Sequence, residues 1–348
     1  MSMLRKDPVS GGWVIMAREV IPRPPALQPI NETETTSEAS CPFCEGNERM
    51  TPPEIWADRA GGMGKNGRGW QLRVIPNKFA LLRIEGEVTR SGEGIYDMVN
   101  GVGAHEVIIE SPRHNARMAH YKQARMESVV RTWRDRMNDL YRDQRFRYVQ
   151  IFRNYGQSAG SRIFHAHSQI MALPITPRWI ADEMRSTHEY YEYKERCLFC
   201  DIIQQEIKAN TRVVAINEGF IAIEPFAARF PFETWILPRR HSHDFQFLTD
   251  GEIPALAAIM KQALGSIEQA LQNPPFNLVI HSAPQAKPTD SSGLSARQYH
   301  WHMEIIPRLT TVAGFEWGTG FHVNPTLPEE AADFLKQVID EGHLVEEE

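Results

Sequence analysis

The chain has 348 residues, a length that predicts about two domains. Apolar residues make up 42% and charged residues 24%, an ordinary composition that excludes a wholly disordered or fibrous protein. The net charge of −6 lacks the basic excess of a general nucleic-acid binder, so we expect a small-molecule ligand rather than a nucleic acid.

The beginning of the sequence carries no apolar leader segment, and no run of about 18 apolar residues occurs in it. We therefore expect a cytoplasmic protein that is neither exported nor inserted into a membrane. All 4 cysteines fall in two C-x-x-C pairs, Cys41 with Cys44 and Cys197 with Cys200. In a reducing compartment this spacing indicates metal binding or redox chemistry before structural disulfides.

The first half of the chain is predicted to contain a strand, a long helix and two further strands, in that order. Apolar residues predict a strand at 105–114, and an apolar stripe at helical spacing predicts an amphipathic helix over 126–140. Two more apolar runs predict strands at 148–152 and 164–170. The first C-x-x-C pair precedes this series.

The second half repeats the same order after the second C-x-x-C pair. It has a predicted strand at 232–241, an amphipathic helix over 253–271 and strands at 276–281 and 299–307. The sequence therefore predicts two copies of one structural unit.

This repeat predicts the fold class and the domain boundary. We expect an α+β fold with two tandem domains, each a mainly antiparallel sheet with one long helix. The boundary is placed in the polar stretch before Cys197. This gives an N-terminal domain at residues 1–185 and a C-terminal domain at residues 186–348.

Each C-x-x-C pair could supply two thiolates to one tetrahedral ion, and a structural zinc site needs two further ligands. Histidines stand in matching places in the two halves, one closing the first strand and one in the last strand. The two predicted ligand sets are Cys41, Cys44, His114 and His165, and Cys197, Cys200, His241 and His300. We expect two zinc ions per chain; a redox pair or buried thiols are the alternative.

The run H-A-H-S-Q at 165–169 is a second chemical signal. On a strand, His165, His167 and Gln169 would line one face, because alternate side chains point the same way. A neutral imidazole is a nucleophile toward phosphorus and can divide group transfer into two displacements. A metal site or satisfied core histidines are the alternatives. Glycines upstream at 156 and 160 favour catalysis, since they let backbone N–H groups approach a phosphate.

At these residues the sequence resembles the histidine-triad superfamily, most closely its galactose-1-phosphate uridylyltransferase branch. The similarity covers nearly the whole chain and includes C-P-F-C at 41–44, V-I-P-N-K at 74–78, S-P-R-H at 111–114 and the segment 154–169. The stretch G-F-E-W-G-T-G at 314–320 is more similar to the subgroup that includes plant ADP-glucose phosphorylase.

The resemblance implies an activity and roles for single residues. His167 would be the nucleophile that forms a covalent nucleotidyl-histidine, in a ping-pong exchange between UDP-glucose and a hexose 1-phosphate. Gln169 would hold the transferred phosphoryl group. The remaining residues implied to bind substrate are Asn77, Asn154, Gly160, Ser161, Arg18 and Arg23. The two arginines would act across the interface of a homodimer.

The amide of Gln169 separates the branches of the superfamily. Hydrolases of this type carry a third histidine there, and an amide cannot donate a proton as an acid does, so hydrolysis is disfavoured. In the second half His302 takes the place of the nucleophile, but Glu304 follows and would repel a phosphate. We therefore expect the C-terminal domain to be catalytically degenerate.

Three departures leave the substrates open. Arg162 stands where the family usually has a small residue beside the phosphates, and glycines at 314 and 320 replace charged residues that contact the hexose. Nothing around Asn77 separates uracil from adenine. One alternative is therefore an ADP-glucose phosphorylase that uses inorganic phosphate as acceptor. Another is a non-enzymatic binding module stabilised by zinc, but the intact H-A-H-S-Q run argues against it.

Overall fold

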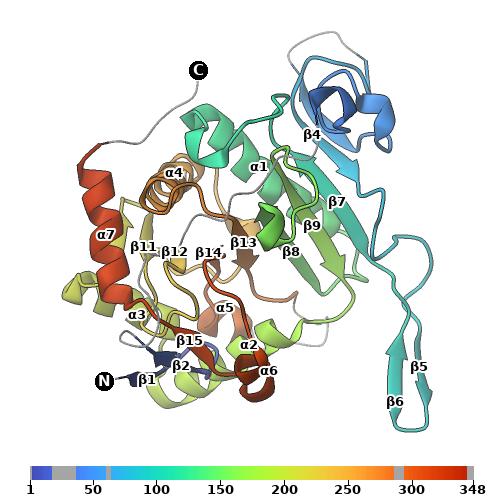
Figure 1. The fold of residues 1–348 in the computed structure, drawn as a ribbon. Helices are drawn as coiled ribbons and strands as arrows, with labels where there is room; N and C mark the ends of the chain where they lie inside the picture. The colour runs from blue at the N-terminus through green and yellow to red at the C-terminus, as the bar shows by residue number, and fades with distance from the viewer. Residues whose placement is uncertain (1, 18–36, 60–63, 286–293, 343–348) are drawn as a thin grey trace.

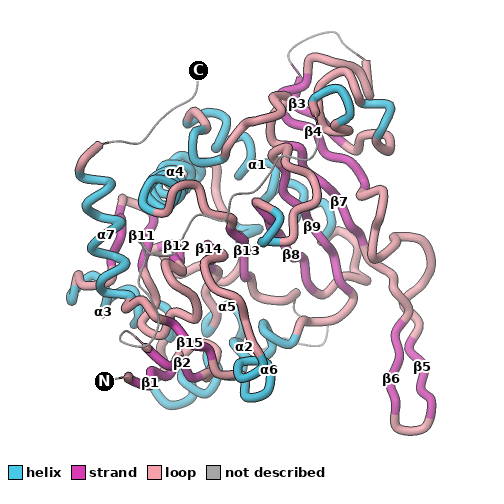
Figure 2. Tube along the Cα trace, in the orientation of Figure 1, coloured by secondary structure: helices cyan, strands magenta, loops and turns pink. Residues whose placement is uncertain are grey.

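The structure is a computed structural model that describes residues 2–17, 37–59, 64–285 and 294–342. Figure 1 shows helices packed around a long, strongly twisted sheet, and Figure 2 shows which parts of the same trace are helix, strand and loop. In the described part of the chain no helix is both long and apolar enough to cross a membrane.

The first half of the chain contributes nine strands and one long helix among the described residues. The strands are β1 (Met3–Lys6), β2 (Trp13–Met16), β3 (Trp56–Arg59), β4 (Trp70–Pro76), β5 (Arg90–Glu93), β6 (Tyr96–Val99), β7 (Ala104–Ile109), β8 (Tyr148–Tyr155) and β9 (His167–Leu173), and the helix is α1 (Gln123–Leu140).

The second half contains more helix than the sequence pattern predicted. Its strands are β10 (Val213–Ile216), β11 (Phe220–Ile223), β12 (Thr234–Pro238), β13 (Phe276–His281), β14 (His302–Pro307) and β15 (His322–Asn324). Its helices are α2 (Arg178–Lys194), α3 (Leu198–Ala209), α4 (Ile253–Ala270), α5 (Leu294–Gln298), α6 (Gly314–Thr319) and α7 (Pro328–Asp340).

Both halves contribute to one sheet of 10 strands, in the order β10-β11-β12-β14-β13-β8-β9-β7-β4-β3. All of its neighbouring strands run antiparallel, as expected for this α+β fold. The pairing of β8 with β13 joins the halves, with Asn154 directly opposite Asn277. The two predicted sheets are therefore continuous. Strand β13 of the second half lies beside β8, and β8 lies beside β9, which begins at His167 of the H-A-H-S-Q run.

The two long helices cover one face of this sheet. Their buried residues, including Trp133 of α1 and Met260 of α4, form the main hydrophobic core together with the inward side chains of the strands. The indole N–H of Trp133 donates to the hydroxyl of Ser168 at 2.7 Å, which ties β9 to the helix layer. Because side chains alternate along a strand, His167 and Gln169 then point to the opposite face.

That opposite face differs between the halves. In the second half, Leu198, Phe199 and Ile203 of α3 pack onto β11 and β12 and form a separate apolar cluster. In the first half, the loop that carries the first C-x-x-C pair packs onto Val107 and Ile109 of β7. The candidate active site lies beside this loop.

Candidate active site

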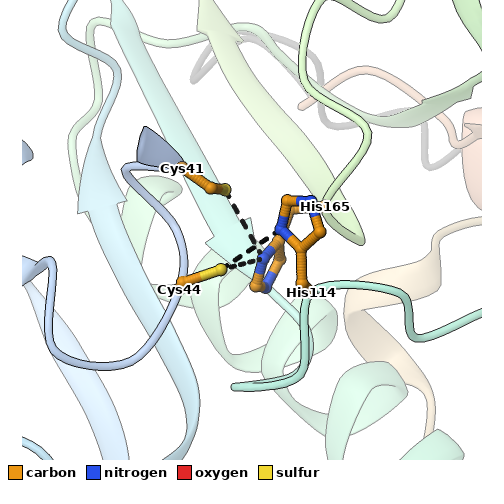
Figure 3. Close-up of side chains that lie close together, drawn as sticks. All are labelled: Cys41, Cys44, His114 and His165. Carbon is orange, nitrogen blue, oxygen red and sulfur yellow. Dashed lines mark hydrogen bonds between the residues drawn. The ribbon is translucent and has the colours of Figure 1, made fainter. Parts of the chain in front are cut away.

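The first predicted ligand set converges on one point (Figure 3). Nδ1 of His165 lies 3.7 Å from Sγ of Cys41 and 3.6 Å from Sγ of Cys44, and Nδ1 of His114 lies 3.2 Å from Sγ of Cys44. Zinc bonds of about 2.0 to 2.3 Å in a tetrahedron place sulfur and nitrogen ligands about 3.5 Å apart. The spacing therefore fits a zinc ion.

The hydrogen bonds behind the ligands support a metal site. Nε2–H of His165 donates to the backbone carbonyl of Ser111 at 2.7 Å, which leaves the lone pair of Nδ1 directed at the cysteines. Ligating histidines in metal sites are oriented by such bonds from the other ring nitrogen. The residues at this site could thus hold a metal ion without rearrangement.

The second ligand set has the same design. Nδ1 of His300 lies 4.0 Å from Sγ of Cys197 and 3.7 Å from Sγ of Cys200, and Nδ1 of His241 lies 3.4 Å from Sγ of Cys200. Nε2–H of each histidine donates to a backbone carbonyl at 2.8 Å. Hydrogen bonding with Cys197, and then with the two histidines, lowers the pKa of the Cys200 thiol. The thiolate is the form that binds zinc.

His167 begins β9 and is held in a tautomer suited to nucleophilic attack. Nδ1–H donates to the backbone carbonyl of His165 at 2.7 Å, so the lone pair is on Nε2. Burial lowers the pKa of His167 to about 4 despite this hydrogen bond, so the ring is neutral near pH 7. Within the described residues Nε2 makes no hydrogen bond, and it is therefore available to an electrophile.

The loop that carries the first C-x-x-C pair also contacts His167 directly. Phe43, inside the C-P-F-C pair, packs edge-on against His167 with ring centroids 5.2 Å apart and against His165 at 6.1 Å. Phe43 and the carbonyl of His165 therefore both position the His167 ring. A disturbance of the first Cys/His cluster would reach His167 through these two contacts.

Two amide side chains flank His167. The pairing of β8 with β9 ends with Phe152 opposite Gln169, and alternation along each strand puts Asn154 on the same face as His167. Nδ2 of Asn277 donates to Oδ1 of Asn154 at 2.8 Å and to the carbonyl of Ala159 at 2.8 Å. With its oxygen occupied, Asn154 offers N–H donors, which suit the oxygens of a phosphate.

The loop after β8 is shaped by two glycines with positive φ, Gly156 at 86° and Gly160 at 90°. A side chain is strained in this conformation, so glycine is needed at both positions. The hydroxyl of Ser161 donates to the carbonyl of Ile163 at 2.8 Å and thus stabilises the turn. Arg162 is exposed on this loop. Substrate contacts of Gly160 and Ser161 stay predictions.

The equivalent histidine of the second half is enclosed. His302 has 0% exposure and is surrounded by Phe199, Trp235 and His281, with ring centroids 4.9, 5.1 and 5.0 Å away. Glu304 pairs with Arg229 at 2.5 Å instead of facing an open site.

His281 and Glu183 also belong to this buried group, with Nδ1 of His281 2.8 Å from Oε1 of Glu183. Burial alone would lower the pKa of His281, but the charges of Glu183 and Glu304 raise it to about 9. Glu183 and Glu304 are thus each paired with a basic group inside the protein. His302 is fully enclosed, whereas His167 keeps 8% of its surface exposed.

Each predicted ligand set converges on a point of its own, and only the first lies beside His167. Asn77 contacts Gln169, whereas Arg18 and Arg23 lie outside the described residues. Sequence reasoning did not identify His105, which hydrogen-bonds to Gln169, or Asn277 of the other half. The alternation of the 104–109 strand could have placed His105 on the face of the site. No sequence signal indicated that β13 would pair with β8.

The fold and the site define a protein built from two histidine-triad-like halves, of which the first carries a neutral histidine beside a Cys/His cluster. Residues 1–177 match the profile of galactose-1-phosphate uridyl transferase, N-terminal domain, and residues 183–347 match that of the C-terminal domain. The chain therefore belongs to the galactose-1-phosphate uridylyltransferase family.

Individual relatives fall in two activity groups. The chain is 34% identical to ADP-glucose phosphorylase of Arabidopsis thaliana over 96% of its own length and 92% of that protein. It is 28% identical to galactose-1-phosphate uridylyltransferase of Thermotoga maritima, over 97% and 98% of the two chains. The crystal structure of the Arabidopsis ADP-glucose phosphorylase with bound ADP-glucose superposes with a TM-score of 0.80 at 31% identity, covering 97% of this chain and 99% of that one.

Proposed function

We propose that the protein is a nucleotidylyltransferase that passes a nucleoside monophosphate from UDP-glucose to a hexose 1-phosphate through a covalent intermediate on His167. The observation that carries this proposal is the state of the His167 ring. Its Nδ1–H is bonded to the backbone, the ring is neutral, and among the described residues Nε2 makes no hydrogen bond, while Gln169 follows on the same face of β9.

The reaction consists of two displacements at the same phosphorus atom. Nε2 of His167 attacks the phosphorus that bears the nucleoside, a P–N bond forms, and the P–O bond to the sugar phosphate breaks, with its electron pair leaving on the sugar-phosphate oxygen. A phosphate oxygen of the acceptor then attacks that phosphorus, and the electron pair of the P–N bond returns to Nε2. The leaving groups are weakly basic, so no general acid is needed.

The amides of Asn154 and Gln169 would stabilise charge on the oxygens of the transferred group. Fixed N–H donors in a partly desolvated site lower the barrier because they need no reorganisation during the reaction. The carbonyl oxygen of Asn154 is held by Asn277 and that of Gln169 by His105, so both amides present nitrogen to the substrate.

The two Cys/His clusters would each hold one zinc ion in a structural role. With two thiolates and two imidazoles each, the sites are closed by four protein ligands, as in structural zinc centres. The first ion would fix the loop that carries Phe43 and the segment that carries His165, and so would position His167.

A phosphorylase reaction is a second candidate, in which inorganic phosphate is the acceptor and ADP-glucose the donor. The identity of 34% with the plant ADP-glucose phosphorylase, against 28% with the Thermotoga uridylyltransferase, favours it. It uses the same intermediate on His167 and differs in the base and the acceptor.

We also propose a homodimer. The β5–β6 hairpin reaches away from the body of the protein (Figure 1), and every residue of its strands is exposed. A two-stranded hairpin alone in water is marginally stable, which supports a partner surface for it. Sedimentation analysis of the full chain tests this proposal, and a monomer at micromolar concentration would refute it.

Two reaction mixtures test the proposed function and its alternative. UDP-glucose with galactose 1-phosphate should yield UDP-galactose and glucose 1-phosphate, whereas ADP-glucose with phosphate should yield ADP and glucose 1-phosphate. Turnover in the first mixture supports the uridylyltransferase, and turnover in the second alone supports the phosphorylase. A zinc-loaded, folded protein that is inactive in both, with either base and either acceptor, would contradict the proposal.

A further inference from the structure

His105 is a buried residue of β7 to which no motif assigns a role, and it contacts two parts of the candidate site. Its Nε2 lies 2.8 Å from Oε1 of Gln169 on the neighbouring strand β9. Its Nδ1 lies 3.3 Å from the backbone nitrogen of Leu81, in the loop that follows Asn77. The imidazole thus bridges the phosphoryl-binding amide and that loop.

The contact with Leu81 determines which ring nitrogen carries the proton. A backbone N–H can only donate, so Nδ1 of His105 must accept from Leu81. In a neutral imidazole the proton is then on Nε2. Nε2–H therefore donates to Gln169, and the atom of Gln169 that receives this bond is its carbonyl oxygen.

Asn77 supports the same orientation. Its Oδ1 accepts from the backbone N–H of Phe79 at 2.9 Å, so its amide nitrogen faces His105 and Gln169. That nitrogen donates to Oε1 of Gln169 at 3.4 Å. It also lies 3.0 Å from Nε2 of His105, but in this tautomer both nitrogens are donors, so that contact is not a hydrogen bond. Two N–H groups thus converge on one carbonyl oxygen.

Among the described residues, the amide nitrogen of Gln169 itself makes no hydrogen bond. A phosphoryl oxygen only accepts hydrogen bonds, so the productive orientation of Gln169 presents nitrogen to the substrate. Rotation of the amide by half a turn would present its oxygen instead, which repels a phosphoryl oxygen. His105 supplies the shorter of the two contacts that oppose this rotation.

We propose that His105 is a positioning residue, which fixes the amide of Gln169 so that both of its N–H groups face the transferred phosphoryl group. This inference rests on the proposed function. It assigns His105 an effect through Gln169 and no direct contact with the reacting atoms.

Two substitutions separate the donor from the bulk of the ring. His105→Gln places an amide nitrogen near the position of Nε2 and can still donate to Gln169, whereas His105→Asn reaches only the position of Nδ1. Both remove the ring, so a loss of packing affects them alike. The thermal unfolding midpoint of each variant reports that common effect.

The rate of nucleotidyl-His167 formation in single turnover is the main measurement. Removing one preorganised hydrogen-bond donor to a transition state lowers the rate about 100- to 1,000-fold, and this is the largest loss of rate that we expect when Gln169 itself is removed. For His105→Asn we expect a loss of about tenfold to 100-fold, since the amide stays present but is no longer held. His105→Gln should recover most of the wild-type rate, although its unfolding midpoint matches that of His105→Asn.

A double-mutant cycle with Gln169→Ala identifies the route of the effect. If His105 acts through Gln169, His105→Asn causes no further loss of rate when Gln169 is already alanine. An equal loss in both backgrounds would overturn the inference, as would equal rates for His105→Asn and His105→Gln.

A binding measurement keeps this test separate from that of the proposed function. Calorimetric affinities for ADP and UDP should show the same coupling between His105 and Gln169 in wild-type protein, the two single variants His105→Asn and Gln169→Ala, and the double variant. If wild-type protein binds nucleotide but forms no adduct, the proposed function fails while the binding cycle still decides the role of His105. Additive effects on nucleotide affinity would overturn that role.

Discussion

The first metal site should matter for the rate of reaction, whereas the second should matter only for stability. Cys41→Ala and Cys197→Ala remove the corresponding ligand from the two sites and form a matched pair. Each should reduce the zinc content from two ions per chain to about one. The His167 ring depends on the first site through its hydrogen bond to the carbonyl of His165 and its contact with Phe43.

The size of the rate effect follows from those two contacts. A hydrogen bond contributes about 1 kcal/mol net, and an edge-on aromatic contact contributes about 0.5 to 1.5 kcal/mol. Together they represent about 2 kcal/mol of positioning, which corresponds to about 30-fold in rate, since about 1.4 kcal/mol is tenfold. Cys41→Ala should therefore slow nucleotidyl-His167 formation about 30-fold. Cys197→Ala should leave it within about threefold, because the second site adjoins the enclosed His302.

The assay combines elemental analysis with single-turnover kinetics on the folded fraction of each variant. The unfolding midpoint of both variants should fall, because structural zinc binding contributes directly to folding. Equal slowing by Cys41→Ala and Cys197→Ala would refute the reasoning. So would a Cys41→Ala protein that lacks the first ion and forms the adduct at the wild-type rate.

Three further predictions concern Asn277, His302 and Glu54. Asn277→Asp replaces the donor to Asn154 and to the carbonyl of Ala159 by an acceptor, so steady-state kcat should fall by about tenfold or more, and an unchanged kcat would refute the role of Asn277. His302→Gln should lower the unfolding midpoint yet leave kcat within about twofold, whereas a catalytic second half would lose its activity. Glu54 is hydrogen-bonded to Arg59 and Arg73; burial alone would raise its pKa, but these bonds lower it from 4.5 to about 2. The contribution of ionised Glu54 to the free energy of unfolding is complete above pH 4.5 and is lost as the pH falls toward 2. Denaturant unfolding should therefore show that Glu54→Gln lowers the free energy of unfolding by about 3 to 5 kcal/mol at pH 7, and by less near pH 3. A deficit independent of pH would contradict this assignment.

The clustering of each set of two cysteines and two histidines could be predicted from sequence because its signals are local and occur twice. C-P-F-C and C-L-F-C bring two thiolates together within one turn, and the repeated order of strand, helix and strand places a histidine at matching points in both halves. The structure confirms that each set of four ligand atoms converges. It also confirms the α+β fold with antiparallel strands.

The contacts that connect the halves could not be predicted in this way. The pairing of β8 with β13 depends on two strands far apart in sequence, and neither carries a residue that specifies its neighbour. Asn277 therefore gave no sign that it would hold Asn154. The bond from His105 to Gln169 likewise arises from a diagonal relation between neighbouring strands, with Val107 opposite Gln169. A sequence pattern shows the face on which such residues lie, but not their partners.

The covalent intermediate on His167 is the central claim, and intact-protein mass spectrometry tests it most directly. Zinc-loaded protein is mixed with UDP-glucose or with ADP-glucose in separate tubes, without an acceptor. We predict a mass increase of one uridylyl or one adenylyl group, located on His167 by peptide analysis and absent from His167→Ala protein that keeps both zinc ions. The base that is transferred decides between the two candidate reactions. No adduct from either donor, or an adduct that persists in His167→Ala, would contradict the account.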